Sequence, residues 1–256
     1  MKRVFTVVVL GMLLASCGGG NGPDSQPPAT LTSGNWTFYP PTVDSNQFFF
    51  FGGNLTQTGS TVSGVAYIGL PDCVSLMNGA PVTGSIRGNS LTLQTGTTVV
   101  VKITGTISNS KSVTGTYSVS GTCDDGAHGN ITGTYIPPLT GTWNATEVIN
   151  GASVAITLKL TQQETPSLEG YFPLSGTVEY VGSPCVVSAT VNSQSLVLGG
   201  MVGIVVDTSE VDGGSGQLMY AGVLEDPATA TSFNTVEQVM GGGCLSSGNL
   251  ITFTKQ

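Results

Sequence analysis

The stretch "LTSGNWTF" at Leu31–Phe38 returns in altered form as "LTGTWNAT" at Leu139–Thr146, and this repetition decides the fold. More pairs of matching marks follow both stretches in the same order. They are "LTQTG" at Leu55–Gly59 and "LTQQE" at Leu160–Glu164, Cys73 and Cys185, "NSLTL" at Asn89–Leu93 and "QSLVL" at Gln194–Leu198, Cys123 and Cys244, and "NITGTY" at Asn130–Tyr135 and "NLITFT" at Asn249–Thr254. An ordered series of this kind predicts two homologous domains, at 31–136 and 137–256.

Apolar and polar residues alternate in both halves, as at Val154, Ile156, Leu158 and Leu160. A period of two is typical of strands with one buried face. Turn signals such as "DDG" at Asp124–Gly126 separate the alternating runs, and no apolar period of helical length follows the leader. Each half is about as long as an up-and-down meander of roughly eight strands requires. The sequence predicts an all-β protein, and both a barrel and a flattened β-sandwich satisfy this pattern.

Gly34-Asn35-Trp36 and Gly141-Thr142-Trp143 each open one of the predicted domains. Both resemble the Gly-x-Trp motif in the first strand of lipocalin-type (calycin) barrels, although the Thr-Asp-Tyr motif that lipocalins often carry is absent. The resemblance implies two tandem antiparallel up-and-down β-barrels. It also implies that both tryptophans plug a barrel end as structural residues.

Residues 1–16 have the layout of a secretory signal peptide, with Lys2 and Arg3 before an apolar run that is too short to span a bilayer. Leu14-Ala15-Ser16-Cys17 resembles the lipobox of bacterial lipoproteins. This implies cleavage before Cys17 and attachment of acyl chains such as palmitate, which anchor a protein firmly when two or three are present. Gly18 stands where an aspartate would favour the inner membrane, so the outer membrane is expected. Residues 17–30 are expected to form the lipidated cysteine and a flexible linker.

Four cysteines remain once Cys17 is assigned to the lipid. Of the three possible connectivities, the repeat favours Cys73–Cys123 and Cys185–Cys244. Each such disulfide would stabilise its domain by about 4 kcal/mol in the chain-entropy estimate. A zinc site of four thiolates is the alternative, but the chain has no Cys-x-x-Cys pair.

The composition limits the partners and the chemistry. The formal net charge is −8 with 9% charged residues, so nucleic acid is not an expected partner. His128 is the single histidine, and any Ser-His-Asp or Cys-His arrangement would have to use it. Asp207, Glu210 and Asp212 cluster in "DTSEVDGG", where a calcium site and an acid-rich turn are the alternatives. No cofactor is expected.

Four consecutive phenylalanines, Phe48, Phe49, Phe50 and Phe51, stand out in the first half. Neighbours on a strand point to opposite faces, so we expect two rings in the core and two outside. The outer rings need a cover, which the other domain, a partner protein, the membrane surface or the domain's own loop can supply. This face is the predicted interaction face.

Together these features favour a non-enzymatic, lipid-anchored protein of the cell envelope. We expect it to bind a small apolar ligand inside a barrel, or another envelope component, since an eight-stranded barrel is either filled by its own side chains or holds one small ligand. The alternative is a hydrolase that acts on an envelope polymer through Asp207, Glu210 or Asp212.

Overall fold

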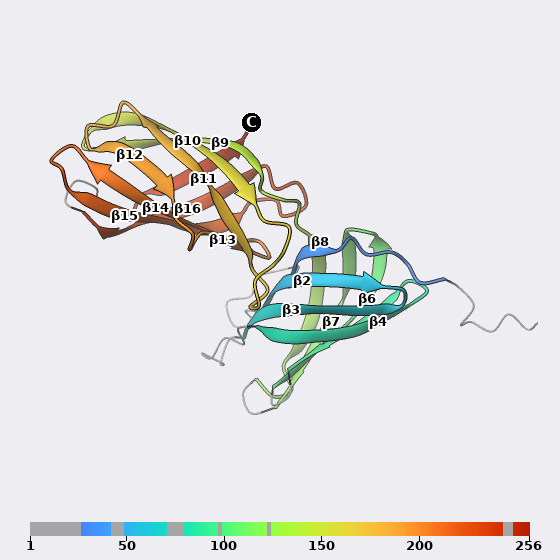
Figure 1. The fold of residues 1–256 in the computed structure, drawn as a ribbon. Helices are drawn as coiled ribbons and strands as arrows, with labels where there is room; N and C mark the ends of the chain where they lie inside the picture. Colours follow the sequence, from blue (N-terminus) through green and yellow to red (C-terminus); the bar gives the residue numbers. More distant parts are fainter. Residues whose placement is uncertain (1–26, 42–48, 71–78, 97–98, 122–123, 243–247) are drawn as a thin grey trace, which may run out of the picture.

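The computed structural model describes residues 27–41, 49–70, 79–96, 99–121, 124–242 and 248–256. These residues form seventeen strands and no helix. The strands form two separate antiparallel sheets, one in each half of the chain (Figure 1). Within the described ranges there is accordingly no helix that could cross a membrane.

The first eight strands close into a barrel in chain order, because β1 pairs with both β2 and β8. Every pairing is antiparallel between neighbours, which makes this an up-and-down barrel. Its strands are β1 (Gly34–Tyr39), β2 (Phe50–Thr58), β3 (Thr61–Gly69), β4 (Ala80–Arg87), β5 (Ser90–Thr95), β6 (Val100–Asn109), β7 (Ser112–Ser120) and β8 (His128–Tyr135).

The second sheet also closes, because β10 pairs with both β9 and β11. The short strand β13 is an addition to eight barrel strands and lies against β11 and β14. The strands are β9 (Gly141–Ile149), β10 (Ala152–Gln162), β11 (Phe172–Val181), β12 (Val186–Val191), β13 (Leu196–Leu198), β14 (Met201–Glu210), β15 (Ser215–Leu224), β16 (Ser232–Gly241) and β17 (Leu250–Lys255). The prediction of two tandem antiparallel up-and-down barrels is confirmed.

The two repeats build the same barrel end. Trp36 and Trp143 are fully buried, and each indole N–H donates to a backbone carbonyl four residues earlier, at 2.8 and 2.9 Å. A glutamine from the next strand, Gln57 or Gln162, accepts a hydrogen bond from the backbone of the segment before each tryptophan. A buried indole needs a partner for its N–H, which the preceding backbone supplies in both barrels. Both tryptophans are therefore structural in this arrangement.

The barrels touch through the second residue of the first Gly-x-Trp motif. The Asn35 side-chain amide donates to the Gly199 carbonyl at 3.0 Å, and the Gly199 amide donates to Asn35 Oδ1 at 2.8 Å. Gly199 lies in the turn between β13 and β14, and its backbone packs against Gly52 on β2. Asn35 is buried, so this pair of hydrogen bonds satisfies a polar group that the barrel contact removes from water.

The run of phenylalanines follows the strand alternation where it is described. Phe49 and Phe51 are buried in the core of the first barrel, and the Phe49 ring stacks on Tyr117 at a centroid distance of 4.1 Å. Phe50 points outward and is half-buried beside Gly199 of the second barrel. Phe48 lies outside the described residues. The second domain is thus the cover of Phe50.

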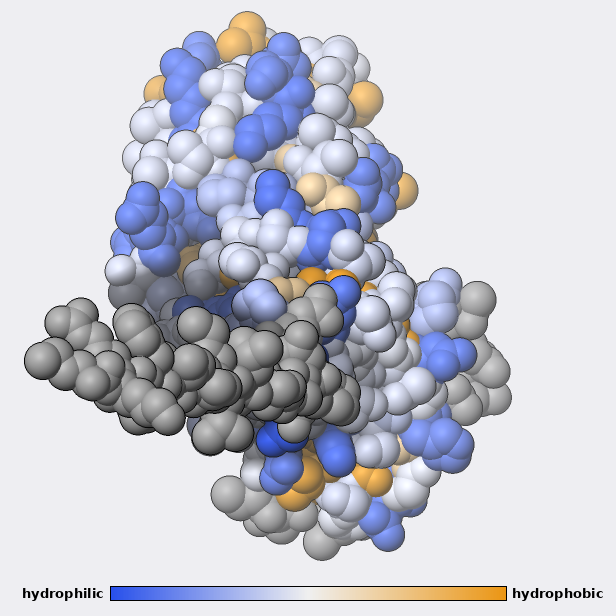
Figure 2. Space-filling model, turned by 90° about the vertical axis from the view of Figure 1, so that its right-hand side faces the viewer, coloured by the Kyte–Doolittle hydropathy of each residue, from blue (hydrophilic) through white to orange (hydrophobic). Residues whose placement is uncertain are grey.

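The described surface has few large apolar side chains. The exposed ones are mainly valines at outward strand positions. On the face drawn in Figure 2, blue and white residues predominate and orange residues are scattered among them.

We expect Gly199→Val to loosen the contact between the barrels. Gly199 has a φ of +52°, and a Cβ there would lie 2.9 Å from the Gly52 Cα, so the barrels must move apart to admit it. Small-angle scattering should show a larger radius of gyration. Gly151→Val is the matched control, since Gly151 also has a positive φ but open space around it. An unchanged radius in both variants would contradict the expectation.

Candidate functional site

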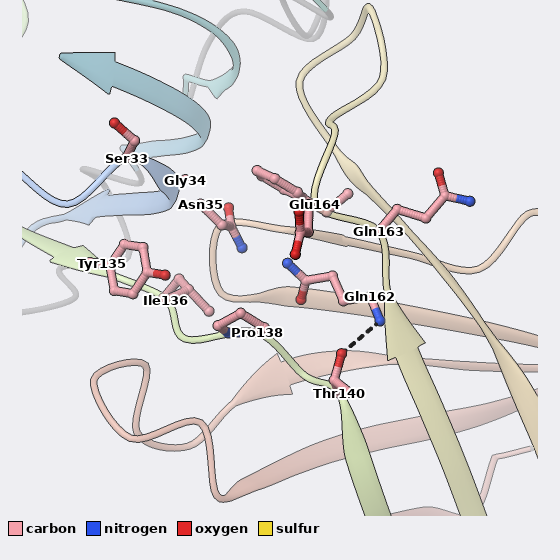
Figure 3. Close-up of a pocket in the computed structure, with 11 residues that line it drawn as sticks. Ser33, Gly34, Asn35, Tyr135, Ile136, Pro138, Thr140, Gln162, Gln163 and Glu164 are labelled. Atoms are coloured by element: carbon pink, nitrogen blue, oxygen red, sulfur yellow. Dashed lines mark hydrogen bonds between the residues drawn. The ribbon is translucent and has the colours of Figure 1, made fainter. Parts of the chain in front are cut away.

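A cavity of about 350 Å³ lies at the junction of the barrels (Figure 3). Asn35, Gln162 and Glu164 point toward it, and Gln163 points away. Its polar residues form hydrogen bonds within the protein. Gln162 is hydrogen-bonded to Leu139 and Thr140, and Asn35 is hydrogen-bonded to Gly199. This cavity is therefore part of the barrel junction.

A second group of polar side chains lies inside the second barrel. On β9 the residues in phase with Trp143 point inward, and Glu147 is one of them, only 4% exposed. On β16 Glu237 is in phase with Phe233 and is 1% exposed. Buried carboxyl groups are rare because desolvation strongly disfavours their charge, so these two, with Glu210 as a third in the same barrel, require a structural or functional reason.

Asn249 joins the two glutamates. Its side-chain amide donates to Glu147 Oε1 at 2.8 Å and to Glu237 Oε2 at 3.0 Å. The other oxygens, Glu147 Oε2 and Glu237 Oε1, are buried and receive no hydrogen bond from a donor in the described residues. The two carboxyl groups are close enough to hydrogen-bond to each other once one is protonated. We call them the acid pair.

The acid pair retains a proton near neutral pH. Burial raises the pKa of Glu237 to about 8, with further contributions from the hydrogen bond and the repulsion of Glu147, while the bond from Asn249 acts in the opposite direction. Two carboxyl groups that share a site cannot both ionise at low cost. At pH 7 Glu237 therefore retains its proton, which it can share with Glu147 in a hydrogen bond.

Two tyrosines complete the buried group. The hydroxyls of Tyr180 on β11 and Tyr220 on β15 meet at 2.7 Å across the barrel, since these two strands are not neighbours in the sheet. Tyr220 is directly opposite Glu237 in the strand register. Burial raises the pKa of both tyrosines, and both glutamates raise it further. The tyrosines are neutral hydrogen-bonding groups beside the acid pair.

The wall of the second barrel opens between β11 and β12. In the described chain these strands pair only at Thr177 and Thr190. The start of β11 pairs with β13 instead, and a bulge interrupts β12 between Val186 and Ser188. A cavity of about 420 Å³ occupies the opening. It is lined by Val178, Glu179, Tyr180, Val181, Val186, Val187, Ser188 and Ala189.

The opening has an apolar rim and a polar interior end. Val181 and Val187 are 55% and 67% exposed at its outer edge, and Val178 and Val186 are buried at its inner edge. Tyr180 lines the same cavity and bonds Tyr220 in the barrel. Tyr180 thus connects the opening with the hydrogen-bonded tyrosine pair inside the barrel.

The structure does not bring together the three acids of "DTSEVDGG". The Asp207 carboxylate lies outside the barrel and accepts from Asn192 at 2.7 Å and Gln217 at 2.8 Å. Glu210 points to the opposite face of β14 and is buried, and Asp212 accepts from the Gly214 amide in a turn. In the described part of the chain no three His, Cys, Asp or Glu side chains are placed to hold a metal ion.

The other residues singled out in the sequence fall in three places. His128 is exposed, with Nδ1 2.8 Å from the Gly126 carbonyl. Cys185 is buried and disulfide-bonded. Cys17, Cys73, Cys123 and Cys244 lie outside the described residues, so the cysteine pairing and the lipid anchor stay predictions.

Sequence reasoning missed Glu147, Tyr180, Tyr220, Glu237 and Asn249. A signal for the glutamates was present: Glu147 is four residues after Trp143 and Glu237 is four after Phe233, so the period of two places each acid on the face of a buried aromatic ring.

Comparison of the chain with known protein families, with curated proteins and with solved structures finds no match.

Proposed function

We propose that this chain is a lipid-anchored protein of the cell envelope that binds a small, largely apolar ligand in its second barrel. The opening between β11 and β12 is the observation that carries the proposal. Ligand sites are concave and mostly apolar, with a few polar groups that fix orientation. The opening combines valines with the polar side chains of Glu179, Ser188 and Tyr180, which can fix the orientation of a ligand.

The first barrel lacks these features among its described residues. Its interior is filled by aromatic and aliphatic side chains, including Trp36, Phe38 and Phe51, and the Phe49–Tyr117 stack. Such a barrel is a packed core. This difference supports a division of roles, in which the first barrel is a scaffold and the second binds.

The envelope location in this proposal rests on the leader. A lipobox ending at Cys17 implies acylation and anchoring in the outer membrane, with residues 18–30 as a tether. Disulfides Cys73–Cys123 and Cys185–Cys244 would suit an oxidising compartment.

The binding role is preferred to the hydrolase alternative for a geometric reason. Asp207 and Glu210 lie on opposite faces of β14, so they do not flank one cleft. A pair of catalytic carboxyl groups must flank the same scissile bond.

A fluorescence titration with N-phenyl-1-naphthylamine, a neutral apolar probe, tests the proposal. Residues 18–256 include every described residue, so both barrels are complete in that form. We expect saturable binding at one probe per chain, and we expect Ala189→Trp to weaken it by about tenfold or more, because the new ring fills the opening. Thr190→Trp is the control, since Thr190 is exposed on the outer face of the same strand. Absence of binding, or equal binding by the Ala189 variant, would contradict the proposal.

A further inference from the structure

The acid pair is a buried carboxyl site that has no cationic side chain beside it in the described part of the chain. The chain has seven Lys and Arg residues, and all but Lys2 and Arg3 are in the described ranges. In those ranges neither Glu147 nor Glu237 forms an ion pair. Lys255, which comes from β17, instead lies over the Trp143 ring at 5.4 Å and bonds the Pro138 carbonyl. A buried anion that lacks a protein partner favours a cationic ligand.

The second barrel also holds polar oxygens that have no hydrogen bond within the described structure. Besides Glu147 Oε2 and Glu237 Oε1, the Thr208 hydroxyl on β14 is buried at 4% exposure and has no hydrogen-bond partner among the described groups. Thr208 is directly opposite Ala189, which lines the opening, and its hydroxyl lies near Glu210 beside Gly216. Native proteins rarely leave buried oxygens unsatisfied, so those of the acid pair are available to a donor from a ligand.

We propose that the second barrel binds an amphipathic primary amine, with its ammonium group on Glu147 and Glu237 and its apolar tail in the opening between β11 and β12. This inference rests on the proposed function, and it adds the chemical class of the ligand. An ammonium group has three donors and one positive charge. The acid pair offers matching acceptors in Glu147 Oε2 and Glu237 Oε1.

A hydroxyl group matches the site less well than an ammonium group. An alcohol supplies a single donor and no charge, so it leaves the anion uncompensated. A divalent metal ion such as calcium needs six to eight oxygen ligands, more than the acid pair and Asn249 provide. The amine therefore fits the described groups best.

The route from the opening to the acid pair passes Tyr180. Its side chain lines the cavity, and its hydroxyl contacts Tyr220, which is paired with Glu237 in the sheet register. The exposed acid Asp207 lies on the outer face of the same barrel and does not line this cavity, so it provides a matched control for simple surface attraction.

Binding of an ammonium ion should release the shared proton. The acid pair holds one proton at pH 7, and a cation between the two carboxylates replaces it without change in net charge. Isothermal titration in two buffers of different ionisation enthalpy measures this release, with about one proton expected per amine. A neutral ligand should release none.

The experiment titrates residues 18–256 with octylamine and with 1-octanol, which share an apolar chain. We expect octylamine to bind more tightly by roughly 10- to 100-fold, because a charge-assisted hydrogen bond contributes more than a neutral one. Glu237→Gln should remove most of this preference and the proton release. Asp207→Asn, a change on the outer face of the same barrel, should leave both unchanged. Glu147→Gln provides a second variant of the acid pair with the same expectation.

The outcomes separate the two proposals. Equal affinities for octylamine and octanol would overturn the amine inference and leave the proposed function standing. An amine preference that persists in both acid-pair variants, or disappears in Asp207→Asn, would also overturn it. Failure of both compounds and of N-phenyl-1-naphthylamine to bind would overturn the proposed function itself.

Discussion

Replacing Glu237 with glutamine is expected to raise the free energy of unfolding at pH 8 by roughly 3–5 kcal/mol. The carboxyl group of Glu237 is buried, and its pKa is raised from 4.5 to about 8. The folded state therefore retains a proton that the unfolded state has lost. Glutamine has the shape of the protonated acid and can accept the hydrogen bond from Asn249 without a buried charge.

The pH dependence follows from the direction of this shift. Below pH 4.5 Glu237 is protonated in both the folded and the unfolded state, so its ionisation does not lower the free energy of unfolding. Between pH 4.5 and about 8 the folded state binds more protons, so the free energy of unfolding falls by about 1.4 kcal/mol per pH unit. Besides Glu237, the titratable side chains inside this barrel in the described residues include Glu147, Glu210, Tyr180 and Tyr220. Both tyrosines stay neutral over this pH range.

Urea unfolding at several pH values measures this effect. The wild-type chain should lose stability from pH 5 to pH 8, and Glu237→Gln should be nearly flat over the same range. Glu179→Gln, an exposed change on β11, should follow the wild type. A wild-type curve that is already flat would show that the acid pair does not retain its proton.

Replacing Trp143 with alanine is expected to lower the free energy of unfolding of the second barrel by about 3–5 kcal/mol. Trp143 is fully buried, packs against Phe233 at 4.8 Å between centroids, and donates its indole hydrogen bond to Leu139. Alanine leaves a large cavity and an unpaired carbonyl at that barrel end. Trp143→Phe should recover part of the loss, since it keeps the ring but not the N–H.

Chemical unfolding followed by circular dichroism checks this prediction. Val148→Ala on the same strand is the control, because Val148 is 63% exposed and should change stability by less than about 0.5 kcal/mol. A change of similar size in both variants would contradict the structural role of Trp143.

The repeat and the strand alternation were enough to predict the fold. Val154, Ile156, Leu158 and Leu160 are all buried on one face of β10, as a period of two requires. The Gly-x-Trp resemblance favoured a barrel over a sandwich, and both sheets close. These features are local or nearly local, so they can be recognised in a single sequence.

The candidate site could not be predicted in the same way. Tyr180 and Tyr220 meet across the barrel from strands that are not neighbours, and the opening beside them depends on where β13 interrupts the pairing of β11. The cover of Phe50 depends on Gly199, nearly 150 positions later in the chain. Contacts between distant strands follow from sheet register and closure, which alternation alone does not determine. The acids of "DTSEVDGG" are close in sequence but do not form one site. Asp207 and Glu210 point to opposite faces of β14.

The most direct test of the account is a crystal structure of residues 18–256 with octylamine bound. The account predicts an alkyl chain in the opening between β11 and β12, beside Val178 and Ala189, with the ammonium nitrogen in hydrogen-bonding distance of Glu147 or Glu237. An amine bound instead in the junction cavity beside Asn35 and Gln162, with the acid pair unchanged, would contradict it.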